Sequence, residues 1–371
     1  MTDKRCTDGV CIPGYIKELV PYTPGKPIEE LEREYGIKDA IKLASNENPL
    51  GPSPKALKAI EEAIGRLHRY PDGSSYYLKN RLAERFGVSP AQIVLGNGSN
   101  ELIEFLVRVF VRSGCEVISS APSFLVYTKV VQAAGGKNVI VPLRDGRHDL
   151  GAIRAAVTPE TRVIFLDNPN NPTGSVIYRS ELDAFLHALP NEVLVVMDEA
   201  YMEFVQGGVT PSGLEYLERG DGRVVTLRTF SKAYGLAGLR VGYGIMDPVL
   251  AGYIERVRQP FNINSLAQAG ALAALDDKEH FNNTLKITLD GRSFLAERLA
   301  GLGCRVFPSH TNFLLVDVHR DAKMVYEAML RQGVIIRAMT AYGFPDHIRI
   351  TVGLPYENER CISALKLVLT D

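Results

Sequence analysis

Short apolar runs rich in β-branched residues alternate with helical patterns between about residues 92 and 245. The runs are continuous, with no polar residue at every second position, which is typical of strands that have helices on both faces. This order predicts an α/β fold built on a mainly parallel sheet. We expect strands in QIVLG, CEVISS, NVIVPL, RVIFLD, EVLVVMD and RVVTLRT.

The pattern changes near residue 263, where a long helical region begins. The strand-like runs CRVFP, TNFLLVDV, VIIRAM and HIRITVG follow it, and a helical pattern closes the chain. A length of 371 residues exceeds what one compact core usually organises. We predict an N-terminal arm and linker at 1–40, a large domain at 41–262 and a smaller α/β domain at 263–371.

Composition and charge exclude several classes of partner. The net charge is −1, so no overall field would attract nucleic acid or an acidic membrane, and we expect neither as a partner. No apolar run approaches the roughly 20 residues of a membrane helix, and MTDKRCTDGVC lacks the apolar stretch of a secretory signal. Five cysteines without a C-x-x-C pair favour free thiols in a cytoplasmic protein, although Cys6 and Cys11 could bridge. No metal is expected.

Polar side chains follow several of the predicted strands where each strand ends. Asn97, Asn168, Asp198 and Thr229 all stand at such positions. Ligands of open α/β sheets bind at the carboxyl ends of the strands. The sequence therefore predicts a ligand site at this edge of the sheet.

The stretch TFSKAYGLAGLRVGY, residues 229–243, places Lys232 after two hydroxyl residues and ahead of glycines and an arginine. A lysine amine can hold pyridoxal 5'-phosphate (PLP) as a Schiff base. The hydroxyls of Thr229 and Ser231 and the guanidinium of Arg240 would bind the cofactor phosphate. The alternative is a solvated lysine in a surface turn, which the length of the string disfavours.

Two further strings suit the same cofactor. In VLVVMDEAY, Asp198 ends a strand and could pair with the protonated pyridine nitrogen, while Tyr201 could donate to the ring oxygen. In DNPNNPTG, a rigid turn would hold the amide of Asn171 against that oxygen. Taken alone, each could be an ordinary strand end or turn.

A glycine-rich turn, LGNGSNE at residues 95–101, stands between a predicted strand and a predicted helix. Such a turn presents backbone N–H groups to an anion, so Ser99 and Asn100 are candidates for the phosphate. Glu101 takes the place of the third glycine, which leaves the dinucleotide fingerprint incomplete. Phe124, in APSFLVY, could stack on the pyridine ring or serve as a core aromatic.

Together these strings resemble the fold type I PLP-dependent aminotransferases, and most closely the histidinol-phosphate aminotransferase family of the class II subfamily. The resemblance covers nearly the whole chain. It implies a large domain with a mainly parallel seven-stranded sheet and a smaller α/β C-terminal domain. It also implies transfer of the amino group of L-histidinol phosphate to 2-oxoglutarate, giving imidazole acetol phosphate and glutamate in histidine biosynthesis. The matching strings are PYTPGKPIEEL, LASNENPLGPSP, RYPD, NPNNPTG, DEAY, TFSKAYGLAGLRVGY and HIRITVG.

The resemblance also implies roles for particular residues. Lys232, Asp198 and Tyr201 would be catalytic, with Lys232 as the base. Tyr70 would reach the cofactor phosphate of a second subunit, so a homodimer is expected. Phe124 stands where many members have tyrosine, and a hydroxyl that could touch the substrate phosphate is lost. The cofactor-binding set is Ser99, Asn100, Phe124, Asn171, Asp198, Tyr201, Thr229, Ser231, Lys232, Arg240 and Tyr70, and the substrate-binding set is Tyr22, Asn48, Arg337 and Arg349.

Four other functions stay open at this point. An aromatic amino-acid aminotransferase would place a carboxylate on Arg349, and a phosphothreonine decarboxylase would release CO2. A non-catalytic PLP-binding regulator is disfavoured because the set of Lys232, Asp198, Tyr201 and Arg240 is intact. A dinucleotide-binding oxidoreductase is the weakest alternative.

Overall fold

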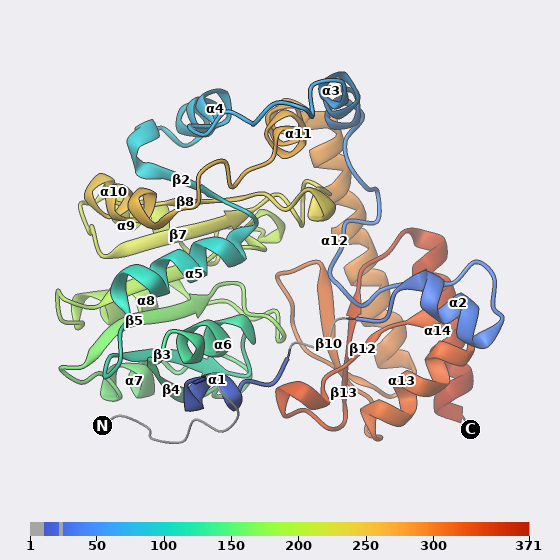
Figure 1. Cartoon of the computed structure of the whole chain (residues 1–371). Coiled ribbons are helices and arrows are strands. Elements are labelled where there is room, and N and C mark those ends of the chain that lie inside the picture. The colour runs from blue at the N-terminus through green and yellow to red at the C-terminus, as the bar shows by residue number, and fades with distance from the viewer. Residues whose placement is uncertain (1–10, 22–24, 371) are drawn as a thin grey trace.

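A seven-stranded mixed sheet lies at the centre of the larger part of the molecule (Figure 1), whose computed structural model describes residues 11–21 and 25–370. The strands are β2 (Ile93–Gly96), β3 (Glu116–Ala121), β4 (Lys137–Pro142), β5 (Thr161–Asp167), β6 (Leu194–Asp198), β7 (Val224–Thr229) and β8 (Gly242–Ile245). They lie in the order β2-β8-β7-β6-β5-β3-β4. All neighbours from β7 to β4 pair in parallel, and β8 is antiparallel to both β7 and β2. The predicted mainly parallel sheet is confirmed.

Helices join and cover the strands (Figure 1). The α-helices are α1 (Gly14–Lys17), α2 (Ile28–Tyr35), α3 (Pro54–Ile64), α4 (Tyr76–Phe86), α5 (Ser99–Phe110), α6 (Val126–Ala133), α7 (Leu150–Ala155), α8 (Arg179–His187), α9 (Gly213–Glu218), α10 (Pro248–Val257), α11 (Ser265–Leu275), α12 (Lys278–Gly301), α13 (Ala322–Arg331) and α14 (Pro355–Thr370). Short 3-10 turns stand at Pro90–Gln92, Met202–Phe204, Ala237–Leu239 and Thr340–Tyr342.

Both faces of the large sheet are buried, as the continuous apolar runs predict. Val163 and Phe165 of β5 belong to one hydrophobic cluster, which also contains apolar residues of α5 and α10. Ile164 and Leu166, the alternate residues of the same strand, belong to another cluster, which contains residues of α8. Successive side chains of a strand point to opposite faces, so the whole run has to be apolar.

Strand β8 was not among the expected strands. Its sequence is GYGI, and glycine is a poor strand former, so the run carries little β signal. The glycines are needed for close packing: a Cβ on Gly242 would lie 2.5 Å from the backbone nitrogen of Ser99. Strand β8 therefore brings the chain against the N-terminus of α5.

A second sheet lies in the C-terminal part, with its strands in the order β12-β13-β10-β9. Its pairs are antiparallel, and α12, α13 and α14 contribute to the hydrophobic cluster around it. The run VIIRAM was expected as one strand but is divided between two sheets, because β11 pairs with β1 and β12 pairs with β13. The bounds are β1 (Ile41–Lys42), β9 (Arg305–Val306), β10 (Phe313–Asp317), β11 (Val334–Ile335), β12 (Arg337–Ala338) and β13 (His347–Thr351).

The helical region after residue 263 serves both parts of the molecule. Helix α11 packs against α3 and α4, whereas α12 reaches β9, β10 and α14. The division at 1–40, 41–262 and 263–371 stays a prediction. In the part of the chain that the structure describes, no helix is long and apolar enough to cross a membrane.

The cysteines correct one expectation. Cys11 is disulfide-bonded, so the expected free thiol is wrong at this position. Thiol pairing depends on spatial approach, which the spacing of the cysteines left open. Cys6 lies outside the described residues, and Cys115, Cys304 and Cys361 are free and buried.

Candidate active site

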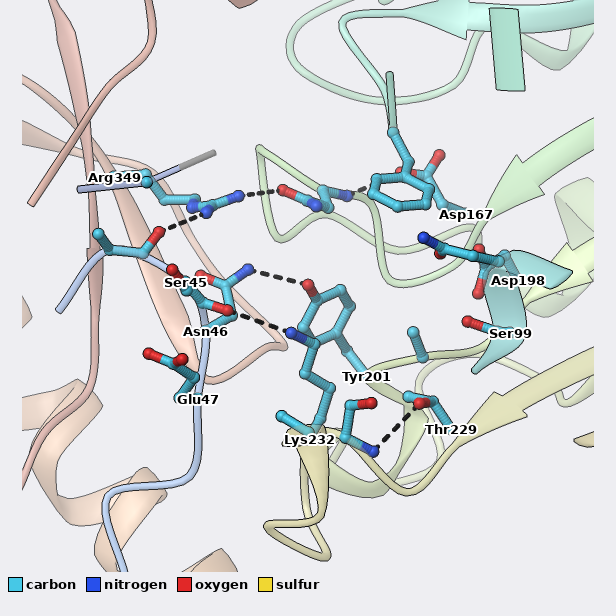
Figure 2. A pocket seen from close by; sticks show the side chains of 18 of the residues that line it. Ser45, Asn46, Glu47, Ser99, Asp167, Asp198, Tyr201, Thr229, Lys232 and Arg349 are labelled. Carbon is cyan, nitrogen blue, oxygen red and sulfur yellow. Dashed lines mark hydrogen bonds between the residues drawn. The ribbon is translucent and has the colours of Figure 1, made fainter. Parts of the chain in front are cut away.

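A cavity of about 240 Å³ lies at the carboxyl ends of the central strands. Figure 2 shows side chains that converge on it from the large sheet, from the segment after β1 and from β13. The predicted edge of the sheet therefore carries the site. The lining residues are Gly25, Ala44, Ser45, Asn46, Glu47, Ser99, Asn100, Phe124, Asp167, Asn171, Asp198, Ala200, Tyr201, Thr229, Ser231, Lys232, Ala237, Arg240, Arg337, Tyr342 and Arg349.

Lys232 stands just after β7 and points its amine into the cavity (Figure 2). Its Nζ donates to the backbone oxygen of Ser45 at 3.2 Å. Desolvation, followed by the positive charge of Arg349, lowers the pKa of Lys232 to about 8. A substantial share of this amine is therefore neutral near physiological pH, as a nucleophile or a base requires.

Asp198 ends β6 and lines the cavity with a carboxylate that is only partly satisfied. Tyr127 donates its hydroxyl to Oδ2 at 2.8 Å, whereas Oδ1 has no hydrogen-bond partner among the described residues. Burial is the main cause that raises the pKa of Asp198 to about 7. A buried carboxylate oxygen without a partner suits a cationic N–H donor, which the pyridine ring of PLP provides.

Asp167 is the register partner of Asp198 on β5, but both of its carboxylate oxygens accept hydrogen bonds from the protein. Its Oδ2 accepts from the backbone nitrogen of Asn171 at 2.8 Å, and its Oδ1 accepts from the Ser123 hydroxyl at 2.7 Å. The side-chain amide of Asn170 lies 3.2 Å from both oxygens. This carboxylate fixes the turn that presents the side chain of Asn171 to the cavity, a role that the sequence analysis missed.

One end of the cavity is built to hold an anion. Ser99 begins α5, and Asn100, Thr229, Ser231 and Arg240 line the same cavity. The guanidinium of Arg240 lies so close to the turn that a Cβ on Gly98 would meet its Nη2 at 2.6 Å, and Gly98 has a φ of +79°. A helix N-terminus, hydroxyls and a guanidinium together suit a phosphate.

A second cationic region is formed by Arg349 on β13 and Arg337 on β12. The two are register partners in an antiparallel pair, so they lie side by side although twelve positions separate them in sequence. Arg349 is buried and donates to Asn171 Oδ1 at 2.6 Å and to the backbone oxygen of Ala44 at 2.9 Å. Its Nε lacks a partner among the residues described.

Asn46 and Glu47 also line the cavity, and the sequence analysis named neither. Asn46 is buried, has a φ of +55° and donates its side-chain amide to the hydroxyl of Tyr201 at 2.8 Å. Its backbone nitrogen donates to Thr351 Oγ1 on β13 at 2.9 Å. The motif LASNENP is the sequence signal for this segment, and the prediction drawn from it covers only Asn48.

Two predicted site residues that the structure describes do not line the cavity. The side chain of Asn48 donates to Ala233 O and Thr284 Oγ1, each at 3.1 Å, and does not line the cavity. Tyr70 is 84% exposed. Tyr22 lies outside the described residues. The other predicted residues, including Phe124, Lys232 and Arg349, all line the cavity.

The chain is similar to known proteins over nearly its whole length. The family model "Aminotransferase class I and II" matches residues 38–365. A histidinol-phosphate aminotransferase of Desulfotalea psychrophila is 53% identical over 356 residues, which cover 95% of this chain and 94% of the relative. One of Anaeromyxobacter sp. is 51% identical over 360 residues, 96% of this chain and 99% of the relative. The solved histidinol-phosphate aminotransferase of Sinorhizobium meliloti, in complex with PLP, superposes with a TM-score of 0.88 at 33% identity and covers 97% of both chains.

Proposed function

Because the chain belongs to the class I and II aminotransferases, and within them to the histidinol-phosphate aminotransferase family, we propose that it transfers the amino group of L-histidinol phosphate to 2-oxoglutarate with PLP as its cofactor. The products are imidazole acetol phosphate and glutamate, and the reaction belongs to histidine biosynthesis. One observation carries the proposal: the amine of Lys232 shares a cavity with arginines from two separate regions and with an Asp198 oxygen that has no hydrogen-bond partner among the described residues.

The cavity offers matching partners to each part of the cofactor. Asp198 Oδ1 would accept from the protonated ring nitrogen, and Tyr201 and Asn171 would donate to the ring oxygen. Phe124 would flank the ring. When bound, PLP supplies an aldehyde that takes up the amino group and a cationic ring that withdraws electrons from the adjacent carbon. The residues proposed to hold the phosphate are Ser99, Asn100, Thr229, Ser231 and Arg240.

Lys232 has the properties of the group that moves the proton. Its lowered pKa means that Nζ is available as a neutral amine near pH 8. In that state it accepts the proton from the substrate carbon that bears the amino group, as a general base. The protonated Nζ would then act as a general acid toward the carbon of PLP that carried the aldehyde oxygen, not toward the substrate carbon.

Arg349 and Arg337 would hold the anionic groups of the substrates. Histidinol phosphate carries a phosphate, and 2-oxoglutarate and glutamate carry carboxylates, so both half-reactions need cations in the same place. Guanidinium groups bind both kinds of anion with paired hydrogen bonds. Tyr22 and Asn48 are kept as candidates for substrate contact.

We also propose a homodimer in the cytoplasm. Tyr70 is exposed and does not line the cavity of its own chain, which fits a role in the site of a second copy. Leu67, Tyr76 and Tyr77 in the same stretch are exposed as well. A cluster of exposed apolar side chains is typical of an interface between subunits.

A panel of amino donors with 2-oxoglutarate tests the substrate. We expect kcat/KM for histidinol phosphate to exceed that for phenylalanine and tyrosine. A preference for phenylalanine would replace the proposed substrate while leaving the reaction class, and CO2 release from phosphothreonine would replace the reaction.

The variant Lys232→Ala tests the class itself. We expect loss of the visible absorbance of the purified protein with PLP and collapse of transamination. Retention of both properties would exclude the proposed chemistry.

A further inference from the structure

Tyr127 is a buried residue of α6 that makes direct contact with the proposed cofactor machinery. Its hydroxyl donates to Asp198 Oδ2 at 2.8 Å, across 71 positions of sequence. Its ring is stacked on Phe165 of β5, with centroids 4.6 Å apart and planes at 3°. It also meets the ring of Phe124 edge-on, at 5.6 Å and 84°. The packing on two sides fixes where the hydroxyl points.

The neighbouring carboxylates differ in how they are satisfied. Asp167 accepts hydrogen bonds from Ser123, Asn170 and Asn171, so both of its oxygens are occupied by the protein. Asp198 has a side-chain donor on Oδ2 and none among the described residues on Oδ1. Tyr127 therefore settles which oxygen of Asp198 is engaged by the protein and which is left to the cavity.

We propose that Tyr127 is a positioning residue that acts through Asp198: its hydroxyl holds Oδ2 so that Oδ1 faces the ring nitrogen of the cofactor as an ionised acceptor. The same ring supports Phe124, so one side chain orders two of the groups proposed to meet the pyridine ring. This inference rests on the proposed function, because it assumes that PLP occupies the cavity.

The electrostatics of the site show why such a donor is needed. Burial raises the pKa of Asp198 and the nearby charges of Asp167 and Glu199 raise it further, whereas the hydrogen bond from Tyr127 and, to a smaller extent, the backbone N–H of Ala200 lower it. Tyr127 does not lose its own proton, because burial and the charge of Asp198 hold its pKa well above the ordinary value. The hydroxyl thus stays a donor, and its hydrogen bond favours the ionised form of Asp198 against the effect of burial.

The test uses Tyr127→Phe in the full-length protein, with Tyr243→Phe as the matched control. Tyr243 is also fully buried, but its hydroxyl has no hydrogen-bond partner among the described residues. The measurements are the dissociation constant for PLP and the nitrogen-15 NMR shift of PLP labelled at the ring nitrogen. We expect Tyr127→Phe to weaken PLP binding about 10- to 100-fold, the effect of removing a hydrogen bond to a charged group. The nitrogen signal should move toward that of neutral pyridine, and Tyr243→Phe should match the wild type.

A double-mutant cycle with Asp198→Asn separates action through Asp198 from general damage to the core. If Tyr127 acts through Asp198, Tyr127→Phe adds little to the loss of affinity in the Asp198→Asn background. If Tyr127→Phe alone fails to fold, recovery of folding on adding Asp198→Asn supports the proposal, since a neutral amide no longer needs the donor. Absence of that recovery contradicts it.

Three results would overturn the role of Tyr127. They are wild-type affinity and nitrogen shift in Tyr127→Phe, equal losses in Tyr127→Phe and Tyr243→Phe, and an undiminished effect of Tyr127→Phe in the Asp198→Asn background. A wild-type protein that binds no PLP at all would instead overturn the proposed function, and this inference with it.

Discussion

Lysine is usually a charged residue at the protein surface, but the surroundings of Lys232 make its amine reactive. The stretch around it places the amine beside Arg349 and in a partly desolvated cavity, and both effects disfavour its charged form. The hydrogen bond to the backbone oxygen of Ser45 orients the amine in the cavity. The reactive state of Lys232 is a property of this surrounding structure, because free lysine has a pKa of about 10.4.

The ionisation of Lys232 can be measured directly on cofactor-free protein. We expect its rate of acetylation by a dilute reagent to rise with pH and to level off above about pH 8, where the neutral amine predominates. Free Nα-acetyllysine in the same solution provides the control, and its rate should rise to about pH 10.4. Mass spectrometry measures the acetylation of the peptide that contains Lys232 and of the free Nα-acetyllysine. A midpoint for Lys232 equal to that of the free compound would show that the surroundings do not lower its pKa.

Arg349 offers a second test at the residue scale. Its guanidinium donates in two directions, to Asn171 and to Ala44, which a lysine ammonium on the same strand would not reproduce. We expect Arg349→Lys to lower kcat/KM for both anionic substrates on the order of 100-fold, mainly through KM. Arg320→Lys, at an exposed position of the C-terminal part, should leave both constants near wild type. If kcat and KM of Arg349→Lys equal those of the wild type, Arg349 has a structural role only.

Site residues that stand in a short, recognisable motif could be predicted from the sequence. Residues whose role depends on a contact with a residue far away in the sequence were missed. Lys232, Asp198 and Arg240 each stand in a motif, and all three line the cavity. Asn46 and Tyr127 are defined by contacts to Tyr201 and Asp198, at separations of 155 and 71 positions. The motif LASNENP marks the segment of Asn46, but no local pattern encodes the contacts themselves, because they arise only when the fold brings distant segments together.

At the scale of elements, the strands with the strongest hydrophobic runs were predicted, and those that depend on glycine or on a change of partner were not. Strand β6 was expected from EVLVVMD and is present as LVVMD. Strand β8 contains two glycines in four residues, so its apolar signal is weak. The run VIIRAM satisfies a strand pattern throughout, but its pairing with β1 ends at Ile335 and a second pairing, with β13, begins at Arg337.

The turn between β2 and α5 supplies a prediction at this scale. Gly98 has a φ of +79° and lies against Arg240, so Gly98→Ala brings backbone strain and also displaces the guanidinium. Gly114→Ala is the matched control, because Gly114 has a φ of +90° and no atom of the described residues lies within 4 Å of the added Cβ. We expect both variants to lose about 1–3 kcal/mol of unfolding free energy from strain. Only Gly98→Ala should lose affinity for PLP, by about tenfold if one charged hydrogen bond is weakened.

Thermal unfolding and titration with PLP measure the two effects separately. Equal affinities for PLP in the two variants would show that the position of Arg240 does not depend on Gly98. A loss of affinity in Gly114→Ala would show that strain alone is sufficient.

At the scale of the whole molecule, the site exists only where the two sheets and the segment after β1 meet. Arg349 of β13 donates to Ala44, Lys232 of the large sheet donates to Ser45, and Asn46 bonds to both Tyr201 and Thr351. These bonds join residues 155 to 305 positions apart, and they form only when both parts are folded. The catalytic groups therefore become buried and oriented only when the large sheet, the C-terminal sheet and the segment after β1 pack together.

Tyr70 would extend the site to a second chain, since it is 84% exposed and absent from the cavity lining of its own chain. If it completes the site of a second subunit, Lys232→Ala and Tyr70→Ala subunits should complement each other. In a hybrid dimer, the site that keeps Lys232 receives its Tyr70 from the Lys232→Ala partner, so one of its two sites is intact.

Random mixing of the unfolded variants followed by refolding makes half of the dimers hybrids, so we expect about a quarter of wild-type activity. Each variant refolded alone provides the control and should be far less active than the mixture. Light scattering at each protein concentration establishes the dimer independently. A mixture no more active than the sum of the separate variants would place Tyr70 outside any shared site. The homodimer would then rest on the measured mass alone.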